Sequence, residues 1–245
     1  MTSRRAAAVL AGALVAAGCG GSSHSVSSGT TTSTAAAVTT TTTVPSTVDP
    51  AKANQAKAAI LQLNDLPAGF QATDPTDGSG LHIDKVWADI TSCLGLPAPG
   101  GTSSVEAAST TFTRGIATQA MSAVEYTATP AAPTVGTALN GPKSQDCLTG
   151  AFTTDLKASA PSGGTPGKVT IAPLDGVPQV GDSVFARRMT APIDLGGGFV
   201  VHIVEDMVVV FKGTTMVRML FLDPGGVGFP QDLEHTLIQQ VVSRS

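Results

Sequence analysis

The chain has 245 residues, of which 42% are hydrophobic and only 4% aromatic. It carries 14 Lys and Arg residues against 18 Asp and Glu, a net charge of −4. No basic stretch follows the first residues, which argues against a nucleic acid partner bound through its phosphates. The scarcity of aromatic rings counts against sugar-binding and peptide-binding sites, which often depend on them.

The first twenty residues form an export segment. Arg4 and Arg5 make a positively charged start, and residues 6–17 are a continuous run of apolar and small residues. That run is about a dozen residues long, whereas roughly twenty are needed to cross a hydrocarbon core. It therefore predicts a signal peptide and not a membrane span. Loss of the two arginines leaves 12 basic against 18 acidic residues, a net charge of −6.

The end of this segment resembles the lipobox of bacterial lipoprotein signal peptides. Ala17-Gly18-Cys19 fits the last three positions, and Ala16 stands where Leu is usual. The resemblance implies that residues 1–18 are removed and that Cys19 carries a diacylglyceryl thioether with further acylation, such as palmitate. Two or three acyl chains hold a protein firmly, so we expect anchoring at the extracytoplasmic face of the cell membrane. The alternative is an ordinary secretory signal with a cysteine near the cleavage site.

Residues 19–48 are dominated by Ser, Thr, Gly and Ala, including an unbroken run of threonine at 39–43. Such a composition buries too little apolar surface to offset the entropy of ordering. The segment is predicted to be a disordered tether with an r.m.s. reach on the order of 30 Å.

The chain has three cysteines, Cys19, Cys93 and Cys147. If Cys19 is acylated, the other two form an isolated pair, and outside the cytoplasm such a pair most simply forms a disulfide. The alternative is two unrelated buried thiols. Neither cysteine has a second Cys or a His at ligand spacing, so no metal site and no cofactor is predicted.

Residues 49–245 are expected to fold as one domain. Asp49-Pro50 is a typical start of a helix, and the clearest helical period has Ile83, Val86, Trp87 and Ile90 on one face. Gly141-Pro142 should interrupt a third helical stretch. The predicted helices span 50–63, 83–94, 133–156 and 231–242.

Strands are predicted at 110–113, 121–129, 168–172, 183–191, 199–204, 207–211 and 216–222. The last four are separated by short turns, one of them at Glu205-Asp206, so they should form an antiparallel meander. We therefore expect an α+β fold with a mostly antiparallel sheet, a C-terminal β-meander and helices packed on it. One disulfide, Cys93–Cys147, would join two of the helices.

This order of elements resembles that of actinobacterial exported proteins. The shared features are a first helix leading into residues 66–70 (Leu-Pro-Ala-Gly-Phe), two cysteines on helices, and a Gly-Asp-Ser strand start before a valine-rich hairpin. Those proteins include lipoproteins of unassigned role and extracellular sensor domains of mycobacterial-type Ser/Thr kinases. The resemblance implies a ligand-binding or ligand-sensing role and carries over no functional residue.

One set of residues echoes a catalytic triad. Gly181-Asp182-Ser183 is similar to the nucleophile block of GDS-type esterases, and Asp232 lies three residues before His235 as in their second block. A serine nucleophile needs an imidazole base and an orienting carboxylate. In that family the serine opens a helix near the start of the domain, whereas Ser183 opens a predicted strand late in the chain.

A second cluster, His202, Glu205 and Asp206, permits metal binding, although a solvated hairpin end explains it better. Our main hypothesis is a lipid-anchored extracytoplasmic ligand-binding or sensor-like domain without catalysis. Its partners would be the membrane, through the anchor, and a small molecule, lipid or protein. The alternatives are a carrier that encloses a lipid or glycolipid between sheet and helices, and an esterase that uses Ser183, His235 and Asp232.

Overall fold

The computed structural model describes residues 51–73, 82–98, 104–115, 118–160 and 164–245. The predicted signal peptide, Cys19 and the tether lie outside the described residues.

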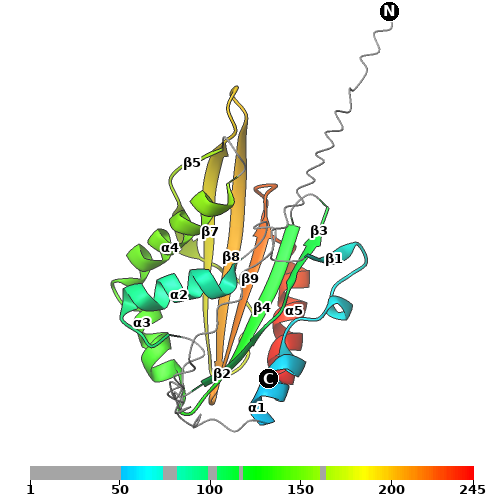
Figure 1. The fold of residues 1–245 in the computed structure, drawn as a ribbon, viewed down its shortest axis with the longest axis vertical. Coiled ribbons are helices and arrows are strands. Elements are labelled where there is room, and N and C mark those ends of the chain that lie inside the picture. Colours follow the sequence, from blue (N-terminus) through cyan, green and yellow to red (C-terminus); the bar gives the residue numbers. More distant parts are fainter. Residues whose placement is uncertain (1–50, 74–81, 99–103, 116–117, 161–163) are drawn as a thin grey trace, which may run out of the picture. The chain divides into compact units, whose positions relative to one another are not determined.

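A nine-stranded sheet forms the centre of this part of the chain (Figure 1). Its strand order is β1-β3-β4-β9-β8-β7-β5, with β2 also paired to β4 and β6 to β7. Every described pairing is antiparallel, which confirms the α+β prediction. The strands are β1 Phe70–Thr73, β2 Ser104–Ala108, β3 Thr111–Arg114, β4 Thr118–Thr127, β5 Thr165–Pro166, β6 Thr170–Pro173, β7 Ser183–Asp194, β8 Val200–Lys212 and β9 Thr215–Asp223.

The C-terminal meander consists of three long strands, β7, β8 and β9. The predicted turn at Glu205-Asp206 was wrong, because β8 runs without a break through both residues. Asp206 is buried and bonds to Arg188, its direct partner on β7. Glu205 is buried on the opposite face of the strand. Acidic side chains are mostly exposed, which is why the sequence predicts a turn at this pair, but here the sheet buries both.

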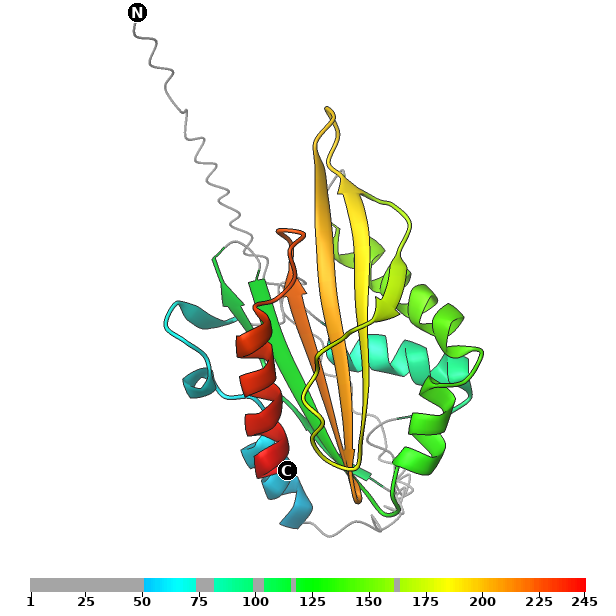
Figure 2. The ribbon, with the colours of Figure 1, turned by 180° about the vertical axis from the view of Figure 1, so that it is seen from behind.

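Helices cover both faces of the sheet (Figures 1 and 2). One face carries α1 (Ala51–Ala59) and α5 (Gln231–Arg244), and the other carries α2 (Ile83–Leu94), α3 (Thr137–Leu139) and α4 (Ser144–Ser159). Short helical turns lie at Leu63–Asp65 and Ala132–Gly136. Within the described residues, no helix combines the length and the apolar character that a membrane span requires.

Alternation along the central strands gives each face its own apolar core. Leu237, Ile238 and Val241 of α5 pack against the face of the meander that includes Val208 and Val217. The opposite face presents Met207, Val209 and Leu220, among others, to α2 and α4. Because successive strand residues point to opposite faces, β7, β8 and β9 contribute side chains to both cores. Residues 207–211 are therefore buried on both faces of the sheet.

The predicted disulfide joins Cys93 of α2 to Cys147 of α4, with 5.6 Å between their Cα atoms. Both helices lie on the same face of the sheet. The bond therefore ties together two elements that are 54 residues apart in the chain.

Candidate functional site

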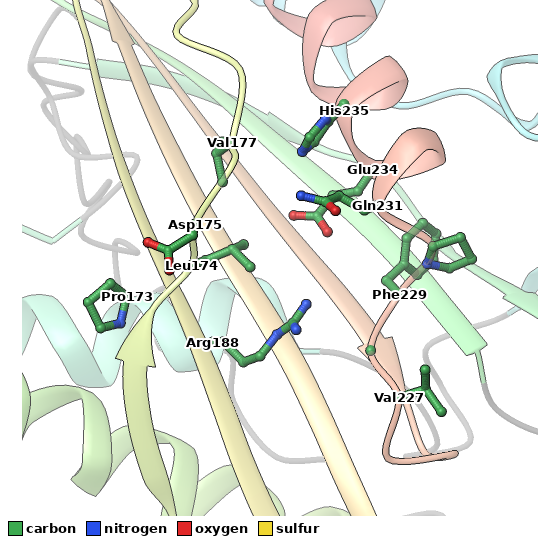
Figure 3. Close-up of a pocket in the computed structure, with 12 residues that line it drawn as sticks. Pro173, Leu174, Asp175, Val177, Arg188, Val227, Phe229, Gln231, Glu234 and His235 are labelled. Carbon is green, nitrogen blue, oxygen red and sulfur yellow. The ribbon is translucent and has the colours of Figure 1, made fainter.

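A cavity of about 500 Å³ opens between the meander and the first turn of α5 (Figure 3). This volume lies within the range of small-molecule sites. We call it the α5 cavity, and it is lined by Pro173, Leu174, Asp175, Val177, Arg188, Val227, Gly228, Phe229, Pro230, Gln231, Glu234 and His235.

Two segments that leave the sheet form the walls of the cavity. After β6, which pairs with β7, residues 174–177 run beside α5, and Val177 is buried there. After β9, residues 224–230 lead into α5. Gly228 has a φ of +95° and donates its N–H to Asp223 Oδ2 at 3.1 Å. A Cβ at this position would lie 2.9 Å from Arg188 Nη2, so the close approach to the guanidinium and the positive φ both favour glycine.

Arg188 supplies the charge on the sheet side of the cavity. Its Nε and Nη2 donate to the two carboxylate oxygens of Asp206, each at 2.7 Å. The Asp206 side chain is fully buried, whereas that of Arg188 is 35% exposed. The hydrogen bonds to Asp206 raise the pKa of Arg188. Among the described residues nothing bonds to Nη1, so the end of the guanidinium keeps a free donor edge.

Glu234 supplies the matching group on the helix side. It is 1% exposed, and its Oε1 has no hydrogen-bond partner in the described part of the chain. Burial raises the pKa of Glu234 to about 8; the charge of Asp206 raises it further and that of Arg188 opposes the shift. The side chain is therefore mostly a neutral carboxyl group at neutral pH, and such a group has an O–H to donate.

The remaining polar side chains come from α5 and from the segment after β6. Figure 3 shows Gln231 and Glu234 extending from α5 toward residues 174–177, while Arg188 reaches from β7 toward the helix. Gln231 lies so close to Gly176 that a Cβ there would be 2.6 Å from its amide nitrogen. The α5 N-terminus has no side-chain cap, so its first N–H groups add positive potential at the same place.

The residues of the echoed triad do not share a site. His235 lines the α5 cavity, whereas Ser183 lines a separate cavity of about 490 Å³ with Asn140 and Phe211. The Gly-Asp-Ser segment also has a structural role. Gly181 has a φ of +72°, and Asp182 accepts the Gly213 N–H at 2.6 Å, which fixes the β8–β9 turn against the start of β7.

The second predicted cluster is divided between the two faces of β8. Asp206 bonds to Arg188 on the α5 side, and Glu205 faces Phe152 and Leu156 of α4 on the other side. Burial, together with the charges of Asp155 and Asp206, raises the pKa of Glu205 well above its usual range. Within the described residues, no group of three or more potential ligands is placed to hold a metal ion.

Sequence reasoning missed Glu234 as a site residue, although a signal for it exists. It occupies the same helical stripe as Leu237, Ile238 and Val241, at spacings of three, four and seven residues. A carboxyl group on the apolar face of a helix is either paired or has a raised pKa. Of Arg188 the sequence says only that it and Arg187 point to opposite faces of their strand, so that at most one of them can face a ligand. Arg188 has no such signal, because its partner lies 18 residues away.

A comparison of the chain with protein-family models, curated proteins and solved structures finds no match.

Proposed function

We propose that the protein is a lipid-anchored extracytoplasmic domain that binds a small molecule in the α5 cavity without changing it chemically. The observation that supports this most is the buried, unpartnered Oε1 of Glu234, a residue that lines the α5 cavity together with Arg188. Of the buried side-chain atoms without a partner in the described residues, Glu234 Oε1 is the one whose residue lines this cavity, and such atoms call for an explanation. A ligand that supplies the missing partner would account for this one.

The anchor belongs to the same proposal. The positively charged start, the short apolar run and Cys19 together support export and acylation. On this view, the tether holds the folded part near the outer face of the membrane, where it meets small molecules of the cell envelope. The likeness to kinase sensor domains in the order of elements agrees with such a role.

Native mass spectrometry of protein purified from its own host tests both halves of the proposal. We expect a covalent mass increase from acyl chains on the peptide that begins at Cys19, and a non-covalent mass from one bound small molecule. The bound mass should be lost in Arg188→Lys and kept in Arg187→Lys, which makes the same change on the neighbouring residue of β7.

A bound long-chain lipid or glycolipid would favour the carrier alternative. A protein that begins at Met1 without acyl mass would contradict the anchor, and an empty cavity in every preparation would contradict the binding role.

A further inference from the structure

We propose that the ligand of the α5 cavity carries a carboxylate, held between Arg188 and the carboxyl group of Glu234, and a short apolar body that packs against Leu174 and Val177. This inference rests on the proposed function and specifies the class of ligand. It follows from the hydrogen-bonding groups that remain unused on the two sides of the cavity.

Arg188 has hydrogen-bond donors that no other group in the described residues uses. Its hydrogen bonds to Asp206 use one edge of the guanidinium, made of Nε and Nη2. The other edge of the guanidinium, which includes Nη1, has no partner in the described residues, and Arg188 lines the cavity. Two parallel N–H groups in this geometry match the two oxygens of a carboxylate.

Glu234 supplies a second hydrogen-bond donor. Because its pKa is about 8, it is a neutral carboxyl group at pH 7 and can donate one hydrogen bond. Arg188 lies near enough for its charge to affect this pKa. Two donors that line one cavity are best matched by a ligand with acceptor oxygens, and a carboxylate supplies them in one group.

A cationic ligand fits the α5 cavity less well than an anionic one. An ammonium ligand would need Glu234 to be ionised, and with a pKa of about 8 that requirement weakens binding about tenfold at pH 7. It would also meet the like charge of Arg188 and the positive end of α5. Asp206 would attract an ammonium ligand only weakly, because Arg188 already neutralises the Asp206 carboxylate.

The charged and titratable groups around Glu234 come from four elements. Arg188 and Asp206 face it from β7 and β8, Asp175 lies on the segment after β6, and Asp232 and His235 flank it on α5. Ionisation of Glu234 would put a third carboxylate beside Asp206 and the ligand. Carboxylate binding should therefore weaken as the pH rises through 8.

Three probes with the same body and different head groups test the inference. Pentanoate, pentanamide and pentylammonium are titrated into the anchored protein in detergent, and ligand-observed NMR measures each dissociation constant. At pH 7 we expect pentanoate to bind at least tenfold more tightly than the other two. Its dissociation constant should rise about tenfold between pH 7 and pH 9, as expected for a group with a pKa of about 8.

Variants separate the two binding groups. Arg188→Lys keeps a positive charge beside Asp206 but loses the planar donor edge, so pentanoate should bind at least tenfold more weakly, while Arg187→Lys should bind as the wild type does. Glu234→Gln keeps a donor that does not ionise. It should bind pentanoate within about threefold of the wild type at pH 7 and lose the weakening above pH 8. If Arg188→Lys does not fold, the carboxylate assignment is tested by Glu234→Gln alone.

Tighter binding of pentylammonium, equal binding of all three probes or binding of none would overturn the carboxylate assignment. The proposed function fails separately, when native mass spectrometry finds no bound molecule. Wild-type affinity that does not change from pH 7 to pH 9 would remove Glu234 from the binding site.

Discussion

The raised pKa of Glu234 also affects the stability of the folded protein. Its folded pKa of about 8 lies above its ordinary value of 4.5, so between these values the folded protein holds a proton that the unfolded chain releases. The free energy of unfolding should therefore fall as the pH rises from about 4.5 and level off above 8, by an amount on the order of 5 kcal/mol. Glu205 and Asp155, whose pKa values are also raised by burial, act in the same direction.

Urea unfolding between pH 5 and pH 9 measures this effect. Glu234→Gln should reduce the decline and make the protein more stable than the wild type at pH 9, because no buried charge has to form. Asp232→Asn, on the exposed side of the same helical turn, should leave the slope unchanged. Parallel curves for the wild type and Glu234→Gln would show that Glu234 ionises in the folded protein as it does in the unfolded chain.

A buried arginine shows that not every internal charge marks a site. Arg218 of β9 is 1% exposed; its guanidinium lies 4.9 Å from the centre of the Trp87 ring and pairs with Glu106 of β2. Burial raises the pKa of Glu106, although the charge of Arg218 opposes the shift. The adjoining cavity has a volume of only about 10 Å³. Arg218 thus joins β2 and β9 through Glu106 and contacts α2 through Trp87, whereas Arg188 and Glu234 line a cavity of about 500 Å³.

Among the elements, α2 and α4 are joined covalently by the Cys93–Cys147 disulfide. The disulfide closes a loop of 54 residues, and in the chain-entropy model such a loop contributes about 4 kcal/mol to the free energy of unfolding. We therefore expect reductant to lower the urea midpoint of the wild type. The Cys93→Ser/Cys147→Ser variant should unfold at the same lower midpoint with and without reductant, and an unchanged wild-type midpoint would contradict the expectation.

Some helices and strands were predicted correctly from sequence patterns alone, and others were not. The helix at 83–94 was predicted with its bounds, because Ile83, Val86, Trp87 and Ile90 repeat at the helical period and Gly95 ends it in a left-handed conformation. The strand β8 was divided wrongly at Glu205-Asp206. The acidic pair looks like a solvated turn until the partner of Asp206 is known, and that partner is set by the register of β7 against β8.

The fold as a whole brings together the residues of the α5 cavity, a site that the sequence alone did not predict. The α5 cavity combines the segment after β6, one residue of β7, the turn after β9 and the first turn of α5. Taken alone, each of these segments has the sequence pattern of an ordinary loop, strand or helix start. They meet because β6 and β7 pair at one edge of the meander and α5 packs back across it (Figure 2). Such a site follows from strand order and register, which periodicity does not determine.

The most direct test of the account is to locate pentanoate on the anchored protein by amide chemical-shift changes at pH 7. We predict changes at Leu174, Val177, Gly228 and Gln231, and none at Asn140 or Ser183 of the separate cavity. Changes at the separate cavity, or no change at the four named residues at saturating pentanoate, would contradict the claim that the α5 cavity binds a small carboxylate.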